Sequence, residues 1–199
     1  MREPAVLLTV ALAGLVVSGT GAHDIGTWLL EVTPIAIAVP VLAATFSRFR
    51  FTVLAYRLMT AGALMMELGA HYTYAHVPLG FWMQDWFGFA RNHYDRLGHI
   101  MQGVVAAIVL RELLLRHTGL RPGRWLWLVL TAGCLGISAG FELIEAAAAT
   151  VSGQGGAYLA TQGDPMDTQW DMLMALLGAL TCQALLSRAH DRQLQESRV

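Results

Sequence analysis

The chain has 199 residues, of which 55% are hydrophobic and only 14% are charged, and its formal net charge at pH 7 is −1. Soluble domains carry charge on about a quarter of their residues, so this composition argues against an ordinary soluble protein. A nearly neutral chain also lacks the basic surface that binds phosphate backbones, so we expect no nucleic-acid partner. The composition favours a membrane protein, whose main partner is the lipid bilayer.

Six apolar stretches approach the roughly 20 residues that a helix needs to cross a bilayer. Along the chain they cover residues 5–20, 27–46, 51–70, 97–115, 125–148 and 166–186. The sequence therefore predicts an all-α fold, a polytopic bundle of about six transmembrane helices that forms a single domain over residues 1–199. The first stretch could be a cleaved signal peptide, but residues 18–23 make a poor cleavage site, so we expect it to be retained.

The arginines predict the orientation, because loops that stay in the cytoplasm retain positive charge during insertion. With six helices threaded, arginine-bearing segments alternate with arginine-free loops; they contain Arg2; Arg48, Arg50 and Arg57; Arg111, Arg116, Arg121 and Arg124; and Arg188, Arg192 and Arg198. Both termini are then predicted to face the cytoplasm from a bacterial inner membrane. Arg91 and Arg96 lie on the opposite side, so they need a local reason such as pairing with carboxylates.

Residues 80–90 form a short aromatic segment between the third and fourth predicted helices. The segment is too short to cross a bilayer. Its tryptophans favour the headgroup region, so we expect it to lie in the membrane interface or to cover the polar residues described next.

Ionisable and polar residues gather at the predicted outer ends of the last four helices. They are Glu67 and His71; Asp95, His99 and Gln102; Glu142 and Glu145; and Asp167, Gln169 and Asp171. Most are spaced by three or four residues, which puts each set on one helical face. We therefore expect four polar stripes to converge on one cavity that faces the periplasm. Asp164, directly before Pro165, instead fits a helix N-cap.

Three interpretations of this cavity remain open. Charge in hydrocarbon costs about 2.5 to 3.5 kcal/mol per residue on insertion scales, so such residues usually pair, line water or carry chemistry. In the first interpretation a divalent metal ion is bound by His71, His99, Glu142, Asp167 and Asp171. The catalytic groups for metal-assisted hydrolysis would then be Asp95, His99, Glu142, Glu145 and Asp171. In the second interpretation the cavity conducts protons or cations, and in the third Arg91 and Arg96 neutralise carboxylates in a structural lock.

If the cavity is an active site, its arginines predict the kind of substrate. Arg91 or Arg96 would bind an anionic group with two hydrogen bonds, and Gln102 and Gln169 would add further contacts. The expected substrate is a lipid or another component of the cell envelope. A homodimer is also possible, since Gly136 and Gly140 form a small-residue face, although such faces are equally used inside one bundle.

Long ordered strings in the sequence resemble the YjdF-type family of bacterial inner-membrane proteins. They read HYTYAHVPLG over residues 71–80, RNHYDRLGH over 91–99, REL over 111–113, FELIE over 141–145 and TQGDPMDTQWDM over 161–172. The resemblance covers most of the chain from the second predicted helix onward. It implies a small polytopic inner-membrane fold and no particular reaction, since that family is one of unknown function.

A weaker likeness is to the VanZ-type family, which is linked to glycopeptide antibiotic resistance. The layout is similar: Asp95 and His99 open one helix, a glutamate follows at 142, and Asp171 precedes a glycine-containing helix. In that family asparagine is usual where Asp171 stands, and Arg91 and Arg96 have no clear counterpart. The likeness implies a substrate in the cell envelope.

Overall fold

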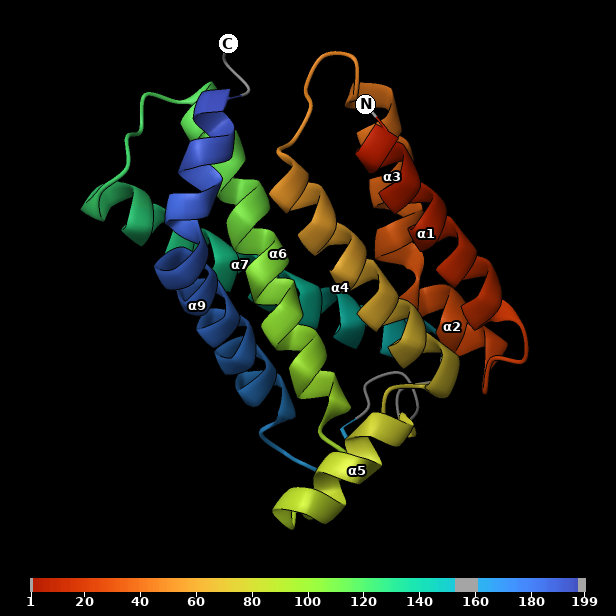
Figure 1. The fold of residues 1–199 in the computed structure, drawn as a ribbon. Coiled ribbons are helices and arrows are strands. Elements are labelled where there is room, and N and C mark those ends of the chain that lie inside the picture. The colour runs from red at the N-terminus through yellow and green to blue at the C-terminus, as the bar shows by residue number, and fades with distance from the viewer. Residues whose placement is uncertain (1, 153–160, 197–199) are drawn as a thin grey trace.

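The computed structural model describes residues 2–152 and 161–196, and within these ranges the chain forms α-helices and no strand. The helices are α1 (Arg2–Gly19), α2 (Ile25–Glu31), α3 (Thr33–Thr45), α4 (Val53–Tyr72), α5 (Pro78–Phe87), α6 (Tyr94–His117), α7 (Arg124–Ser152) and α9 (Asp167–Glu196) (Figure 1). The predicted all-α class is therefore confirmed for the described part of the chain.

The count of about six membrane spans is not confirmed by the described residues. Among the described residues, four helices are long and apolar enough to cross a membrane by themselves, namely α1, α6, α7 and α9, and α2 with α3 would add a fifth. Helix α4 has 20 residues but carries Arg57 and Glu67, and it is less apolar than those four. A multi-span helical bundle is thus confirmed, whereas the count of about six is not.

The predicted continuous helix over residues 27–46 is broken. Helices α2 and α3 meet at Val32 with a bend of 41°. Pro34 stands in the first turn of α3, where it lacks a backbone N–H and disfavours helical geometry in the residue before it. The break leaves Glu31 at the end of α2, inside the bundle.

Helices α6 and α9 lie side by side, and their backbones touch at two glycines (Figure 1). A Cβ atom on Gly103 would overlap the carbonyl oxygen of Ala175, and one on Gly178 would overlap the carbonyl oxygen of Ile100. Only glycine permits so close an approach. The contact fixes the positions of α6 and α9 along each other. It therefore also fixes the residues one and two helical turns away, which include His99 on α6 and Asp171 on α9.

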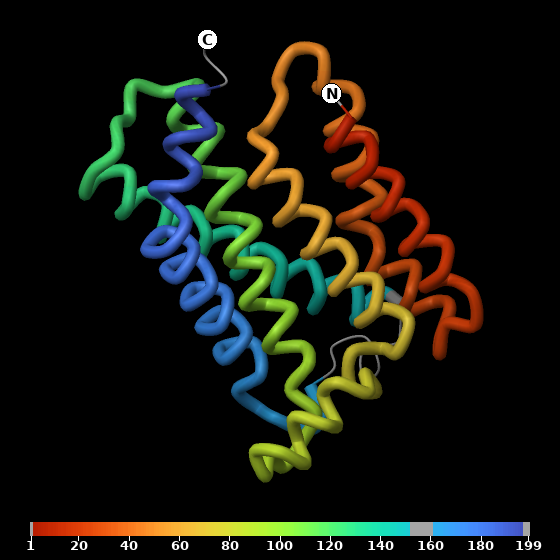
Figure 2. Tube along the Cα trace, viewed as in Figure 1, coloured from red at the N-terminus to blue at the C-terminus, as the bar shows by residue number. Residues whose placement is uncertain are grey.

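Both termini lie at one end of the molecule, together with the loop that joins α3 to α4 and the end of α6 (Figures 1 and 2). These segments are the ones in which the sequence places most of its arginines. Helix α5 lies across the opposite end, where Trp82, Trp86 and Phe87 are exposed. The common end of the two termini agrees with the predicted threading, and the membrane face that this end occupies remains a prediction.

The small-residue face on α7 is open. A Cβ atom on Gly136 or Gly140 would meet no atom within 4 Å among the described residues. These glycines therefore do not serve a close contact within the described bundle, and the homodimer through this face remains a prediction.

Candidate functional site

Two arginines tie the start of α6 to the start of α9. Arg91 donates a hydrogen bond to Asp167 Oδ1, and its other terminal nitrogen lies 3.8 Å from Asp164 Oδ2. Arg96 donates to the same Asp164 oxygen over 2.8 Å. We call Arg91, Arg96, Asp164 and Asp167 the arginine clamp. The two arginines that broke the charge pattern of the loops are therefore paired with carboxylates.

A second contact holds the same loop. Asn92 and Gln162 are joined by two hydrogen bonds, from Gln162 Nε2 to the Asn92 carbonyl oxygen (2.7 Å) and from the Asn92 N–H to Gln162 Oε1 (3.2 Å). The Asn92 side chain donates to the carbonyl oxygen of Val77 over 3.0 Å and packs directly on Gly80. Asn92 is therefore a structural residue of the loop, which sequence reasoning had not singled out.

The Asp164 carboxyl group of the clamp has a lowered pKa. A hydrogen bond from the Met166 backbone N–H lowers the pKa of Asp164, and the guanidinium groups of Arg91 and Arg96 lower it further. Burial lowers the pKa of the neighbouring His93 imidazole, and the same two arginines add to that effect. The positive charge of the arginines is thus matched by Asp164 and Asp167.

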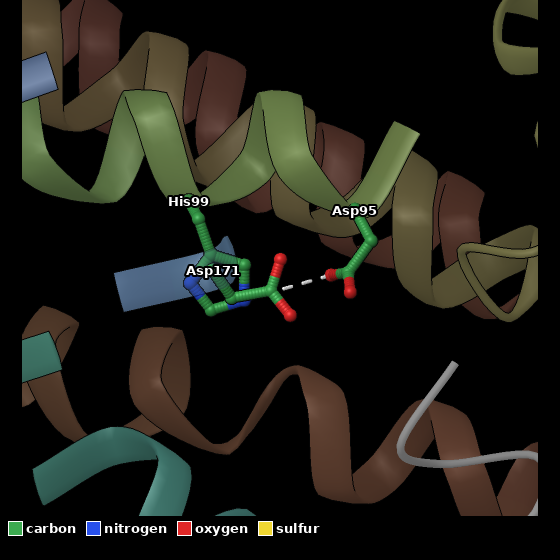
Figure 3. Close-up of side chains that lie close together, drawn as sticks. All are labelled: Asp95, His99 and Asp171. Atoms are coloured by element: carbon green, nitrogen blue, oxygen red, sulfur yellow. Dashed lines mark ion pairs between the residues drawn. The ribbon is translucent and has the colours of Figure 1, made fainter. Parts of the chain in front are cut away.

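A second group of ionisable side chains comes from three different helices. Asp95 and His99 lie on α6, Glu142 and Glu145 on α7, and Asp171 on α9; we call these five residues the His99 cluster. Ligand atoms of Asp95, His99 and Asp171 lie within 4.8 Å of one another, and so do those of His99, Glu142 and Glu145. Figure 3 shows His99 and Asp171 close together, with the Asp95 carboxylate pointing toward them.

The imidazole of His99 occupies the centre of this cluster. Its Nε2 atom lies 3.7 Å from Asp95 Oδ1 and 3.6 Å from Glu142 Oε1. Its Nδ1 atom lies 3.2 Å from Gln102 Oε1, an acceptor, so Nδ1 carries the proton in the neutral ring. The lone pair on Nε2 is then directed at the two carboxylates.

Two of the carboxylates are buried with an oxygen atom that finds no hydrogen-bond partner in the described chain, namely Oε1 of Glu142 and Oδ1 of Asp171. Glu142 is 9% exposed and Asp171 3% exposed. A buried carboxyl oxygen without a donor is costly, and the repulsion of its group from other carboxylates and from an imidazole lone pair adds to the cost. A cation or bound protons would satisfy this arrangement.

Several predicted site residues make their contacts outside the cluster, although Asp167 also interacts electrostatically with Asp95, Glu142 and Asp171. His71 Nδ1 is hydrogen-bonded to the carbonyl oxygen of Ser18 over 2.8 Å, and Glu67 faces α1. Asp167 is held by Arg91, and Gln169 is exposed. None of these four side chains belongs to the two metal-capable groups found among the described residues.

One acidic residue near the cluster was missed. Glu31 at the end of α2 is 6% exposed, and it interacts electrostatically with Asp95 and Glu145. The signal was present, because Glu31 is an acidic residue within a long apolar stretch. The expected continuous helix gave no reason to place it beside the others.

A buried polar network at the opposite end of α6 and α9 was also missed. Glu112 accepts hydrogen bonds from the Thr52 N–H (3.0 Å) and hydroxyl (2.9 Å), from His190 Nε2 (3.0 Å) and from Arg116 (2.8 Å). Arg111 lies 3.1 Å from His190 Nδ1 and donates to Asp191 over 2.7 Å. We call these six residues the Glu112 network. The sequence had pointed to Arg111 and Arg116 as orientation signals, and to Glu112 only within the REL string of the family resemblance.

Comparison with known proteins identifies relatives over nearly the whole chain. A family model described as "Predicted membrane protein (DUF2238)" matches residues 3–192. The inner membrane protein YjdF of Escherichia coli (strain K12) is 47% identical over 197 residues, which cover 97% of this chain and 94% of that protein. No solved structure matches the chain. These comparisons do not support the likeness to the VanZ-type family.

Proposed function

The chain belongs to the DUF2238 family of predicted membrane proteins, and in this multi-pass protein of the inner membrane we propose that the His99 cluster binds a divalent metal ion. The ion would serve the hydrolysis of a lipid or cell-envelope substrate. The site lies at the end of the bundle opposite the arginine-rich loops, so the proposal places it on the periplasmic side.

The observation that carries the proposal is the spacing around His99. Hydrogen-bonded ion pairs have N–O distances of about 2.7 to 2.9 Å, whereas Nε2 of His99 lies 3.6 and 3.7 Å from its two carboxylate oxygens. Two ligands each about 2.1 Å from one ion, at a tetrahedral angle, are about 3.4 Å apart. The spacing therefore suits ligands of a shared ion better than ion pairs.

The ligands would come from His99, Asp95 and Asp171 or from His99, Glu142 and Glu145, since each set is within reach of one point. One imidazole among carboxylates suits Zn²⁺, Mn²⁺ or Fe²⁺. A bound ion of this kind lowers the pKa of a coordinated water molecule. A glutamate of α7 that does not hold the ion would take the proton from that water, and Gln102 would keep Nε2 of His99 directed at the ion.

An anionic group on the substrate would bind at the arginine clamp. The Nε atoms of Arg91 and Arg96 are buried and have no hydrogen-bond partner among the described residues. They are therefore two donors that the pairing with Asp164 and Asp167 leaves unused. A phosphate or carboxylate that reached them would gain charge-assisted hydrogen bonds.

The number of carboxylates favours a second candidate function, the passage of cations or protons. With Glu31, the cluster contains five carboxyl groups, more than one divalent ion can neutralise. The carboxyl groups that the ion does not neutralise would have to hold protons. Release of these protons could then be coupled to the entry of a metal ion, so the site would exchange protons for the ion.

The test is the metal content of protein purified without chelator, measured by elemental analysis. We expect about one ion per chain in the wild type and a loss of at least about tenfold in Asp171→Asn and Glu142→Gln, since each removes a ligand. Asp85→Asn is the matched control, because Asp85 lies exposed on α5. A wild-type protein that neither contains a metal nor takes up Zn²⁺ or Mn²⁺ would refute the proposal.

Activity separates the two candidate functions. In vesicles that contain phosphatidic acid or a prenyl diphosphate as probe, a hydrolase releases phosphate, and the release stops in the same two variants. A cation pathway instead gives pH-dependent flux of the metal across the vesicle membrane without phosphate release. If the variants only lose their folded state, the cluster is a structural lock.

A further inference from the structure

A buried carboxyl group lies apart from both polar regions described above. Glu67 on α4 is 2% exposed, and neither of its carboxyl oxygens has a hydrogen-bond partner in the described chain. It faces α1 at Gly14, where a Cβ atom would overlap its Oε2. The glycine therefore leaves the space that the carboxyl group occupies.

The contact between α1 and α4 repeats one turn further along. Ser18 follows Gly14 by four residues, and His71 follows Glu67 by four. His71 Nδ1 donates to the Ser18 carbonyl oxygen over 2.8 Å, so this nitrogen carries a proton and Nε2 is an acceptor in the neutral ring. The nearest ion pair that joins the two helices, Arg57 with Glu3, lies ten residues from Glu67 on α4 and is exposed.

Among the described residues, Glu67 forms no ion pair and no hydrogen bond through its carboxyl oxygens. Its carboxyl group lies against Gly14 of α1 beside the Leu64 side chain, and His71 follows one turn along α4. A metal ion would need further ligands, and Glu67 belongs to neither metal-capable group found in the described chain. The one species that a single carboxyl group in such surroundings can hold is a proton.

We propose that Glu67 is a proton-binding site between α1 and α4, separate from the His99 cluster and reached from the α5 end of the bundle past His71. At that end the exposed rings of His23 and His76 stack with centroids 4.9 Å apart, and the His23 N–H donates to the His71 carbonyl oxygen over 2.9 Å. Protons thus have titratable groups at the surface beside the buried site. The inference does not rest on the proposed metal site.

The test is modification by the apolar reagent dicyclohexylcarbodiimide, read by peptide mass spectrometry of the full chain in vesicles. The reagent adds to a protonated carboxyl group: the carboxyl oxygen bonds to the central carbon, the proton moves to a nitrogen, and no group leaves. We expect labelling of Glu67 near neutral pH that falls at least about threefold by about pH 9, as the proton is lost. Glu67→Gln should remove the label.

Two further variants connect the label to the geometry. In Gly14→Ala the added methyl group would overlap the position of the Glu67 carboxyl group, so labelling at Glu67 should fall. His71→Gln should slow it, with Tyr72→Phe as the control on the neighbouring position. Size-exclusion chromatography confirms that each variant is folded before labelling.

The outcomes distinguish this site from the metal site. Absence of label at Glu67 in the folded wild type, or a label that persists unchanged at high pH, would overturn the inference while leaving the metal analysis intact. Glu142→Gln should keep the Glu67 label, and Glu67→Gln should keep the metal content of the wild type. Loss of metal in Glu67→Gln would show that the two sites are one.

Discussion

Helices α6 and α9 carry a buried histidine among carboxylates at each end, and the two surroundings differ. In the Glu112 network, Arg111 can only donate, so His190 Nδ1 accepts and His190 Nε2 donates to Glu112. In the His99 cluster, Nδ1 donates to Gln102, and the lone pair on Nε2 faces carboxylates. His190 therefore completes the hydrogen bonds of its network, whereas His99 donates no hydrogen bond from Nε2 to the carboxylates of its cluster.

The difference lies in the balance of charge. The Glu112 network matches the carboxylates of Glu112 and Asp191 with two arginines, and the fully buried Glu112 accepts hydrogen bonds from four donor groups. No arginine is paired with the His99 cluster in the described residues, because Arg91 and Arg96 are held by Asp164 and Asp167. Breaking a complete buried set leaves an uncompensated charge, which is strongly destabilising, whereas the His99 cluster already contains carboxyl oxygens without a partner in the described chain.

The largest expected effect follows from breaking the complete network. Glu112→Ala leaves Thr52, Arg116 and His190 without their acceptor, and we expect a loss of about 3 to 5 kcal/mol in the free energy of unfolding. Unfolding by SDS in mixed micelles measures this value. Glu142→Ala at the other end should cost much less in metal-free protein. Equal losses at the two ends would contradict the distinction between them.

The next effect comes from separating α6 and α9 near the incomplete cluster. The methyl group of Gly103→Ala overlaps the backbone of Ala175, and overpacking of this kind costs about 1 to 3 kcal/mol. Metal content should fall as well, because His99 and Asp171 move apart. Gly136→Ala is the control, since Gly136 faces open space in the described chain and should tolerate a methyl group. Unchanged metal content in Gly103→Ala would show that this contact does not assemble the cluster.

A smaller effect of opposite sign distinguishes the two ends most directly. In protein treated with chelator, Asp171→Asn should leave the thermal midpoint unchanged or raise it, with a gain of up to about 1 kcal/mol, because the crowding of carboxyl groups around Asp171 is relieved. Asp191→Asn should lower the midpoint, because it breaks the bond from Arg111. Destabilisation by both substitutions to the same extent would mean that the cluster is a structural lock after all.

The smallest effect concerns the arginine clamp. The pKa of Asp164 is lower in the folded chain than its ordinary value of 3.8, first because of the Met166 N–H and then because of Arg91 and Arg96. This contribution to stability is complete above pH 3.8 and is lost as the pH falls through the lower folded value. The thermal midpoint of Asp164→Asn should therefore depend less on pH in that acidic range. An identical acid profile in wild type and variant would exclude the clamp as a stabilising pair.

The helices of the bundle were largely predictable, because the apolar stretches that set them are local. The stretch at residues 97–115 corresponds to α6 (Tyr94–His117), and the one at 125–148 corresponds to α7 (Arg124–Ser152). The stretch at 166–186 ends ten residues before the end of α9 (Asp167–Glu196), because the polar end of α9 is stabilised by His190 and Asp191 binding to α6. Hydropathy does not register a helix that is held by ion pairs.

The candidate site was predictable only in part. The sequence by itself determined that Asp95 and His99 share a helical face, since four residues make about one turn, and that acidic groups cluster near helix ends. Only the tertiary structure decided that Glu31 joins them, that Asp167 is taken by Arg91, and that His71 and Glu67 face α1. Helical periodicity fixes the direction of a side chain relative to its own helix, whereas its partner depends on how closely two helix backbones approach, which for α6 and α9 is set by the contacts at Gly103 and Gly178.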